Sequence, residues 1–161
     1  MAITKAKKGE IVDKLVGAFK SAASVVFVNF RGLTVGNTTE LRRKLKSEGV
    51  SYTVAKKSLT KRALTEVKPE GEAPELPGEL SLAWAEDLMA PAREVYAFQK
   101  KFPENLNILG GIFSGKFVTK AYVEELAKIP TLDVLRGKFV NIINSPIQRL
   151  AIELNEISKV K

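Results

Sequence analysis

Residues 40–59, ELRRKLKSEGVSYTVAKKSL, contain a helix, a strand and the start of a second helix in direct succession. Leu41 and Leu45 are four residues apart, which places both side chains on one face of the first helix. The strand, residues 50–55, alternates apolar and polar side chains as a half-buried strand does. A second amphipathic helix follows over residues 58–66. This succession predicts an α+β domain in which helices connect and cover short strands.

The sequence on both sides continues this alternation. Upstream, apolar residues recur at helical spacing over residues 6–22, and a β-branched and aromatic run over residues 24–29 predicts a buried strand. Asn37, with Glu40 three residues later, is the expected start of the next helix. Downstream, the sequence predicts a loop over 67–79, strands over 80–85, 106–112 and 116–118, and helices over 90–102 and from Thr119 to about Lys128. The predicted class is α+β: a mixed β-sheet covered by helices, a ferredoxin-like variant of the αβ sandwich, with a C-terminal helical extension.

Pro130 divides the predicted αβ domain, residues 1–130, from a helical segment, residues 131–161. Pro146 after Ser145 predicts a kink or a restart of that helix. A stripe of large apolar side chains runs along it, and each is worth about 1.5–3 kcal/mol when buried. The stripe therefore packs against a partner helix or folds back on the domain, and the sequence leaves both open. Its proposed partner-binding members are Leu135, Phe139, Ile142, Ile143, Ile147, Leu150, Leu154 and Ile157.

The composition excludes most forms of catalysis. The chain has 161 residues with no Cys and no His, so disulfides, thiol nucleophiles, Ser–His or Cys–His triads and the usual zinc sites are excluded. We expect no catalytic residue, no metal, no cofactor and no small-molecule substrate. No signal peptide or membrane-spanning run is visible, which predicts a cytoplasmic protein with no membrane partner.

Positive charge is concentrated in the first part of the chain. The net charge is +8, and residues 1–66 hold 14 Lys or Arg against 5 Asp or Glu. A one-sided basic field of this kind predicts a polyanionic partner. Few aromatic side chains lie among these cations, which favours a folded RNA over an unstructured strand read by stacking. We expect Tyr52 and Trp84 to pack in the core.

The predicted topology brings several of these cations to one edge of the sheet. The first two strands are joined by a helix, so we expect them to run parallel and to end at the same edge. The lysines that open the first helix should reach that edge too, and two helix amino ends would offer N–H groups to phosphate there. The candidate RNA-binding residues are Lys5, Lys7, Lys8, Arg31, Gly32, Arg42, Arg43, Lys46, Lys56, Lys57, Lys61 and Arg62.

Two other functions are compatible with parts of the sequence. Residues 110–117, GGIFSGKF, approach a phosphate-binding P-loop with Lys116, which would make the protein a small nucleotide-hydrolysing enzyme. However, Phe117 stands where that motif needs Ser or Thr, and a Gly-rich turn between strands explains the same residues. The other alternative is a protein–protein adaptor that uses only the C-terminal helix.

A set of stretches occurs in one order along the chain: RGLT at 31–34, ELRRKLKSEGVSYTVAKKSL at 40–59, GELSLAWAED at 78–87, ILGGIFSGK at 108–116, VEELAKIPT at 123–131 and SPIQRLAIELNEI at 145–157. This ordered set resembles the bacterial large-subunit ribosomal protein L-ten family, whose archaeal and eukaryotic relative is P-zero. The resemblance covers essentially the whole chain. It implies a structural constituent of the large ribosomal subunit and not an enzyme.

The resemblance also implies partners. It implies that the N-terminal domain binds the factor-binding (GTPase-associated) region of large-subunit rRNA, beside ribosomal protein L-eleven. It implies that the C-terminal helix carries dimers of the stalk protein L-twelve, which recruit translation factors. Arg31 and Gly32 match the family's RNA-binding segment, and the family's lysine–asparagine pair falls on Lys56 and Lys57. Because Lys57 replaces that asparagine, a phosphate contact is expected there in place of a side-chain amide contact.

Overall fold

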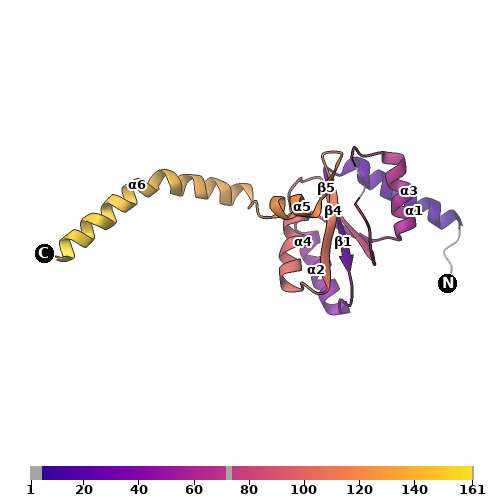
Figure 1. The fold of residues 1–161 in the computed structure, drawn as a ribbon, viewed down its shortest axis with the longest axis horizontal. Coiled ribbons are helices and arrows are strands. Elements are labelled where there is room, and N and C mark those ends of the chain that lie inside the picture. The colour runs from indigo at the N-terminus through magenta and orange to yellow at the C-terminus, as the bar shows by residue number, and fades with distance from the viewer. Residues whose placement is uncertain (1–4, 72–73, 161) are drawn as a thin grey trace. The chain divides into compact units, whose positions relative to one another are not determined.

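The computed structural model describes residues 5–71 and 74–160. The chain divides into two units, Met1–Ile129 and Pro130–Lys161, and each is described by itself. The second unit contains α6 (Leu132–Val160). The first unit contains, in chain order, α1 (Lys5–Ser21), β1 (Ser24–Phe30), α2 (Val35–Ser47), β2 (Ser51–Val54), α3 (Lys57–Val67), β3 (Leu80–Ala85), α4 (Ala90–Lys101), β4 (Leu106–Phe113), β5 (Lys116–Thr119) and α5 (Lys120–Ala127) (Figure 1).

The strand β1 lies at the centre of the sheet, whose order is β2-β3-β1-β4-β5. It pairs with β3 on one side and with β4 on the other, and all the named strand pairs are antiparallel. Its central place follows from a continuous apolar run, because Val25, Val26, Phe27 and Val28 are each at most 3% exposed. A run of this kind is buried on both faces of the strand, so it requires a sheet that is covered on both sides.

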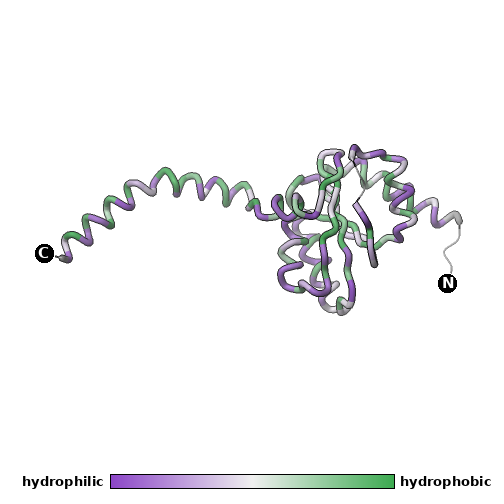
Figure 2. Tube along the Cα trace, in the orientation of Figure 1, coloured by the Kyte–Doolittle hydropathy of each residue, from purple (hydrophilic) through white to green (hydrophobic). Residues whose placement is uncertain are grey.

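Helices cover both faces of the sheet, and Figure 2 shows hydrophobic residues along the strands between them. On one face, α2, α4 and α5 build a core over Val26 and Val28 of β1. On the other face, α1 and α3 build a second core over Val25 and Phe27. The helices contribute Leu41, Leu45, Val95, Phe98 and Val123 to the first core, and Val12, Leu15, Phe19, Leu59 and Ala63 to the second.

The strand order is that of a split β-α-β arrangement, as in ferredoxin-like folds. β1 and β2 run in the same direction because both are antiparallel to β3, and β3 lies between them. The predicted α+β class, with helices around one sheet and a C-terminal helix, is confirmed. The expectation of a mixed sheet is wrong, because the strands joined by a crossover helix are separated by an antiparallel strand.

The predicted helices and strands of the first unit are all found, with ends displaced by a residue or two except at the start of α2. The start of α2 requires a correction. Thr34 is the N-cap, and its Oγ1 accepts a hydrogen bond from the backbone N of Asn37 at 3.3 Å. Asn37 therefore lies in the first turn of the helix. Both residues are good cap types, so local preference did not separate them.

In the second unit, α6 continues through Pro146, so of the two alternatives predicted there, a kink or a restart, the restart does not occur. Figure 1 shows α6 bent near its middle, as expected where a proline removes a backbone donor. The unit is a single helix, so its apolar stripe finds no partner within the unit; Phe139 is 65% and Ile147 68% exposed. Across the described part of the chain, no helix has both the length and the hydrophobicity needed to cross a bilayer.

Candidate nucleic-acid interface

The carboxyl ends of β1 and β2 lie at the same end of the sheet, with the start of β3 between them. The strand register shows this directly, because Asn29 of β1 pairs with Leu80 and Val54 of β2 pairs with Ser81. The prediction that the two strands finish at the same end of the sheet is therefore confirmed. We call this end of the sheet the rim and define it as residues 30–32, 54–58 and 78–80.

Arg31 is held at the rim by Asn105, which lies just before β4. The backbone N of Arg31 donates to the carbonyl O of Asn105 at 2.8 Å, and Nδ2 of Asn105 donates to the carbonyl O of Arg31 at 2.8 Å. Gly32 has a φ of +68°, and a Cβ there would lie 3.2 Å from Nδ2 of Asn105. The loop backbone is thus fixed, while the Arg31 guanidinium remains exposed to solvent.

Lys56 and Lys57 line a cleft of about 670 Å³ at the rim, together with Phe30, Val54 and Glu79. Lys56 is the N-cap of α3 but makes no side-chain capping hydrogen bond. The first backbone N–H groups of a helix have no acceptor within the helix and carry partial positive charge. Two lysines and a helix amino end therefore add positive charge to the same cleft.

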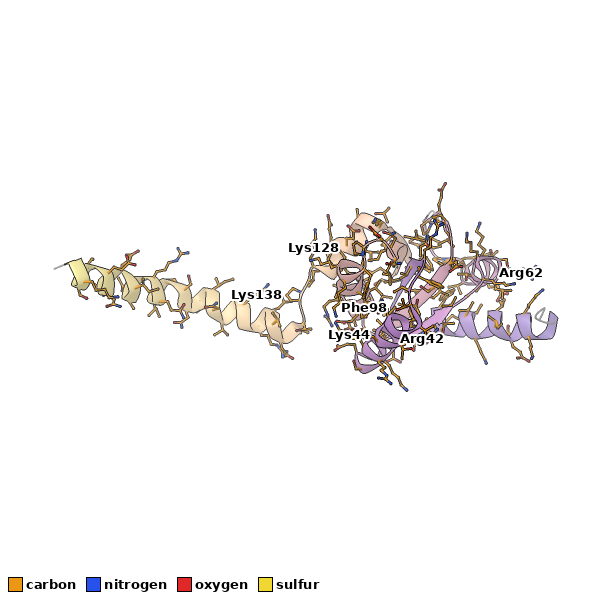
Figure 3. All side chains as sticks on the ribbon, turned by 90° about the horizontal axis from the view of Figure 1, so that it is seen from below. Arg42, Lys44, Arg62, Phe98, Lys128 and Lys138 are labelled. Atoms are coloured by element: carbon orange, nitrogen blue, oxygen red, sulfur yellow. The ribbon has the colours of Figure 1, made fainter. Side chains whose placement is uncertain are left out.

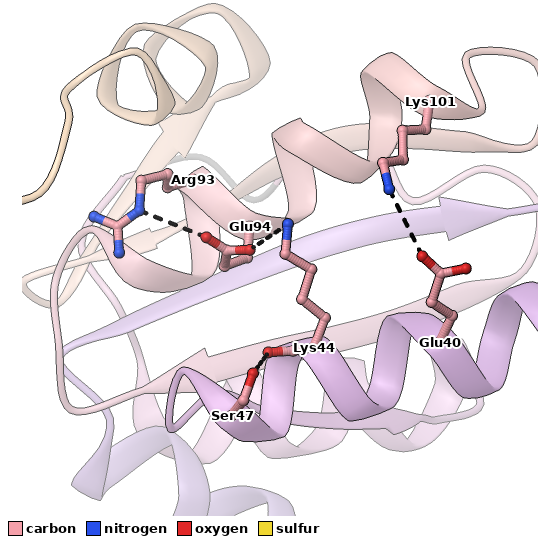
Figure 4. Close-up of polar contacts among 6 residues, drawn as sticks. All are labelled: Glu40, Lys44, Ser47, Arg93, Glu94 and Lys101. Atoms are coloured by element: carbon pink, nitrogen blue, oxygen red, sulfur yellow. Dashed lines mark hydrogen bonds and ion pairs between the residues drawn. The ribbon is translucent and has the colours of Figure 1, made fainter.

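One side of α2 is fixed to α4 by ion pairs, which Figure 4 shows. Lys44 Nζ lies 3.2 Å from Glu94 Oε2, and Lys101 Nζ lies 3.6 Å from Glu40 Oε1. The Glu94 side chain is only 11% exposed, and Arg93 Nε lies 3.6 Å from its Oε1. Oε2 of Glu94 has no hydrogen-bond donor among the described residues, so the Lys44 contact is an ion pair without hydrogen-bond geometry. These contacts join α2 to α4 beside the buried Leu41 and Leu45, which set the face that α2 turns to the core.

The other side of α2 carries Arg42, Arg43 and Lys46, which are exposed. The Arg42 guanidinium lies 5.9 Å from the centre of the Tyr52 ring, which places it beside β2, the outermost strand on that side. Burial raises the pKa of Tyr52 above its ordinary value of 10.0, although a hydrogen bond with Ser81 and the Arg42 charge lower it. Tyr52 is therefore a neutral phenol that packs against the α2 core and supports Arg42, and its expected core position is confirmed.

Lys61 and Arg62 are exposed on α3, which covers the opposite face of the sheet from α2. Figure 3 shows Arg42 on α2 and Arg62 on α3. Lys8 of α1 shares with Arg62 a groove of about 520 Å³, which Asp13 and Glu66 also line. This groove has mixed charge and shares no lining residue with the rim cleft.

The prediction that the lysines of the first helix reach the rim is wrong. The buried stripe of α1 begins at Val12, and residues 7–10, which include Lys7 and Lys8, are exposed. Figure 1 shows the amino end of α1 extending past α3. The side chain of Lys5 lies outside the described part of the structure. Helix α1 packs across α3, so its first turns project beyond the core.

Within the described residues, none of the candidate cations forms an ion pair. The ion pairs that are present use other cations, namely Lys44, Arg93, Lys101, Lys116, Lys120 and Arg136. The rim therefore keeps an excess of positive charge, with Arg31, Lys56 and Lys57 against Glu79, while Asp13 and Glu66 partly offset the charge of the groove beside Arg62. Such excess charge attracts a polyanion such as nucleic acid.

Residues 110–117 form the β4–β5 hairpin and not a phosphate-binding loop. Gly110 and Gly111 lie inside β4, where a Cβ would approach the carbonyl O of Val118 to 2.7 Å and that of Val25 to 2.5 Å. These glycines allow close packing of neighbouring strands. Lys116 begins β5 and pairs with Glu70, with Nζ 3.2 Å from Oε2. Because a strand and not a helix follows the glycines, the nucleotide-hydrolysing alternative loses its structural basis.

Comparison with known proteins identifies the family. Residues 3–100 match the family model described as Ribosomal protein L10. The chain belongs to the ribosomal protein L10 (L-ten) family. Several relatives are named large ribosomal subunit protein uL10. That of Gluconobacter oxydans (strain 621H) is 38% identical over 92% of this chain and 80% of its own length. That of Brucella canis is 39% identical over 92% of this chain and 86% of its own length. That of Rhodospirillum rubrum is 36% identical over 92% of this chain and 86% of its own. The L-ten proteins are structural ribosomal proteins, so this member is not an enzyme.

Several residues that shape this L-ten interface were absent from the sequence-based prediction. Asn105 fixes Arg31 from 74 residues away along the chain. Asn29 Nδ2 donates to the carbonyl O of Pro77 at 3.1 Å and so fixes the segment that enters β3. Phe30 and Glu79 line the cleft. Among them, only Phe30 could have been singled out from the sequence, because this aromatic residue directly precedes the candidate cation Arg31.

Proposed function

We propose that the first unit of this ribosomal protein binds large-subunit rRNA through the rim, in the factor-binding region beside L-eleven. Arg31, Lys56 and Lys57 contact phosphates, while the exposed cations of α2 and α3 extend the positive field on the two sides of the sheet. Binding is driven by phosphate neutralisation and release of counterions, and the shape of the rim sets the register on the RNA.

One observation carries this proposal: Arg31 and the pair Lys56 and Lys57, from segments distant in sequence, follow strands that finish at the same end of the sheet. None of the three forms an ion pair among the described residues. The Asn105 hydrogen bonds hold the Arg31 backbone before any RNA is bound. A surface that is ordered in advance loses less entropy on binding, which favours affinity. The resemblance of RGLT and of the lysine pair to the family's RNA-binding segments supports the same surface.

We also propose that α6 carries dimers of the stalk protein L-twelve, which recruit translation factors, so that the protein joins the stalk to the cytoplasmic ribosome. The proposed contact residues are all between 41% and 70% exposed: Leu135, Phe139, Ile142, Ile143, Ile147, Leu150, Leu154 and Ile157. A stripe of this length in water favours a partner helix, because each apolar side chain gains free energy when it is buried.

The rim assignment is tested by removing its charge. The triple variant Arg31→Gln, Lys56→Gln, Lys57→Gln should bind an rRNA fragment of the factor-binding region at least about tenfold more weakly, with the salt slope smaller by about 1 per cation removed. The matched control, Lys20→Gln, Lys128→Gln, Lys138→Gln, removes equal charge from exposed positions outside the rim. Fluorescence anisotropy measures both. Equal losses in the two variants would mean that net charge, and not the rim, determines binding.

A further inference from the structure

The rim cleft contains apolar side chains that phosphate binding does not explain. Phe30 is only partly buried and packs against neither of the two hydrophobic cores. Val54, which lines the same cleft, is 45% exposed. A phosphate group gains nothing from an aromatic ring, whereas a nucleobase stacks on one. The cleft therefore offers a stacking surface next to Lys56 and Lys57.

Glu79 distinguishes a base from a phosphate as the occupant of this cleft. It is an exposed carboxylate that lines the cleft beside the two lysines and forms no ion pair among the described residues. A carboxylate repels a phosphate, but it accepts hydrogen bonds from the N–H groups on the pairing edge of an unpaired base. The cleft thus has a contact for each part of a nucleotide. The aromatic ring suits the face of the base, the carboxylate suits its pairing edge, and the lysines suit the phosphates.

The wall that carries Glu79 is fixed in place. Asn29 Nδ2 donates to the carbonyl O of Pro77 at 3.1 Å, and Gly78 has a φ of +68°. A Cβ on Gly78 would lie 2.6 Å from Nδ2 of Asn29, so the segment lies close against β1. With a volume of about 670 Å³, the cleft falls in the range of roughly 300–1,000 Å³ that is usual for ligand sites. The cleft is thus formed before any ligand arrives.

We propose that this cleft binds one unpaired nucleobase of the folded rRNA. The base stacks on Phe30, its pairing edge faces Glu79, and Lys56 and Lys57 hold the adjoining phosphates. This inference rests on the proposed RNA-binding function and adds a base-recognition site to it. It keeps the sequence-based expectation of a folded RNA and of a phosphate contact at Lys57, and adds one unstacked base, whose recognition depends on an aromatic surface.

The experiment compares full-length variants on the rRNA fragment of the factor-binding region. Phe30→Leu keeps an apolar side chain but removes the aromatic face, so affinity should fall roughly 5- to 150-fold. The salt slope should stay unchanged, because no phosphate contact is lost. Phe30→Trp should restore affinity, and RNA should quench its fluorescence more than that of the wild type, whose single tryptophan is Trp84. The control Val35→Ala shortens an apolar residue that is 84% exposed and lies outside the cleft.

The outcomes separate the two proposals. Suppose that the wild type binds the fragment and the rim triple variant binds it more weakly, but Phe30→Leu binds as tightly as the wild type. The proposed base site is then wrong, while the proposed phosphate contacts at the rim are supported. If the wild type does not bind the fragment at all, both proposals fail. Should Phe30→Leu unfold, Phe30→Trp decides the matter, because an unquenched indole with normal affinity overturns the base site.

Discussion

Raising the salt concentration from about 50 to about 200 mM should weaken binding of the wild-type protein to its rRNA fragment roughly 10³-fold. The reason is that the rim and its flanking helices present cations that have no carboxylate partners within the described chain. About six phosphate contacts, each releasing a counterion, give a loss of this size. Anisotropy titrations at four or more salt concentrations measure the slope of the logarithm of affinity against that of salt.

The salt slopes of the wild type and of the two triple variants together locate the phosphate contacts. The slope should fall in the rim triple variant and stay near the wild-type value in the control triple variant, because only the first removes proposed phosphate contacts. A slope near zero in the wild type would contradict electrostatic docking altogether. A steep slope that is identical in all three proteins would place the phosphate contacts elsewhere on the molecule.

Deleting residues 131–161 should abolish binding of L-twelve dimers and leave rRNA affinity close to that of the full chain. The first unit contains both hydrophobic cores and every described rim residue, whereas the second contains the exposed stripe. Calorimetry with purified L-twelve and anisotropy with the rRNA fragment measure the two activities on one sample. Loss of both activities would mean that the helix folds back on the first unit and supports it, which is the alternative that the sequence left open.

A pair of point variants separates the stripe from the rest of α6. Leu150 belongs to the stripe, while Ile152, two residues later, points to a different side of the helix, since successive residues are about 100° apart. Both are largely exposed, at 60% and 57%. We expect Leu150→Asp to weaken L-twelve binding by at least about tenfold, as the loss of one buried large apolar side chain implies. Ile152→Asp should have a much smaller effect, and equal effects would rule out a single binding face.

The sequence predicted the helices, the strands and the class of the fold well, because these depend on signals between neighbouring residues. The signals are hydrophobic periodicity within an element and glycine or proline at its ends. The continuous apolar run of β1 and the alternating run of β2 each indicated a strand without reference to any partner. The order of strands depends on pairing between distant segments. The insertion of β3 between β1 and β2 could not be inferred from either strand, and it turned the expected mixed sheet into an antiparallel one.

The candidate site was predictable where it follows strand ends and unpredictable where it depends on tertiary contacts. Arg31 and Lys56 follow strands that point the same way, so their shared edge could be inferred from the crossover alone. The direction of α1 depends on its packing against α3, and the prediction for Lys7 and Lys8 was therefore wrong. Some contacts join residues far apart in the chain, as do the hydrogen bonds of Asn105 to Arg31 and the cleft beside Phe30. No local sequence pattern predicts such contacts.

Ultraviolet crosslinking of purified large ribosomal subunits, followed by mass spectrometry of the crosslinked peptides, tests the RNA-binding rim most directly. The predicted result is nucleotides attached to segments 29–33 and 54–58 of this protein, with Phe30 as the expected aromatic position. Crosslinks found only on α4 and α5, with both rim segments unmodified, would contradict it.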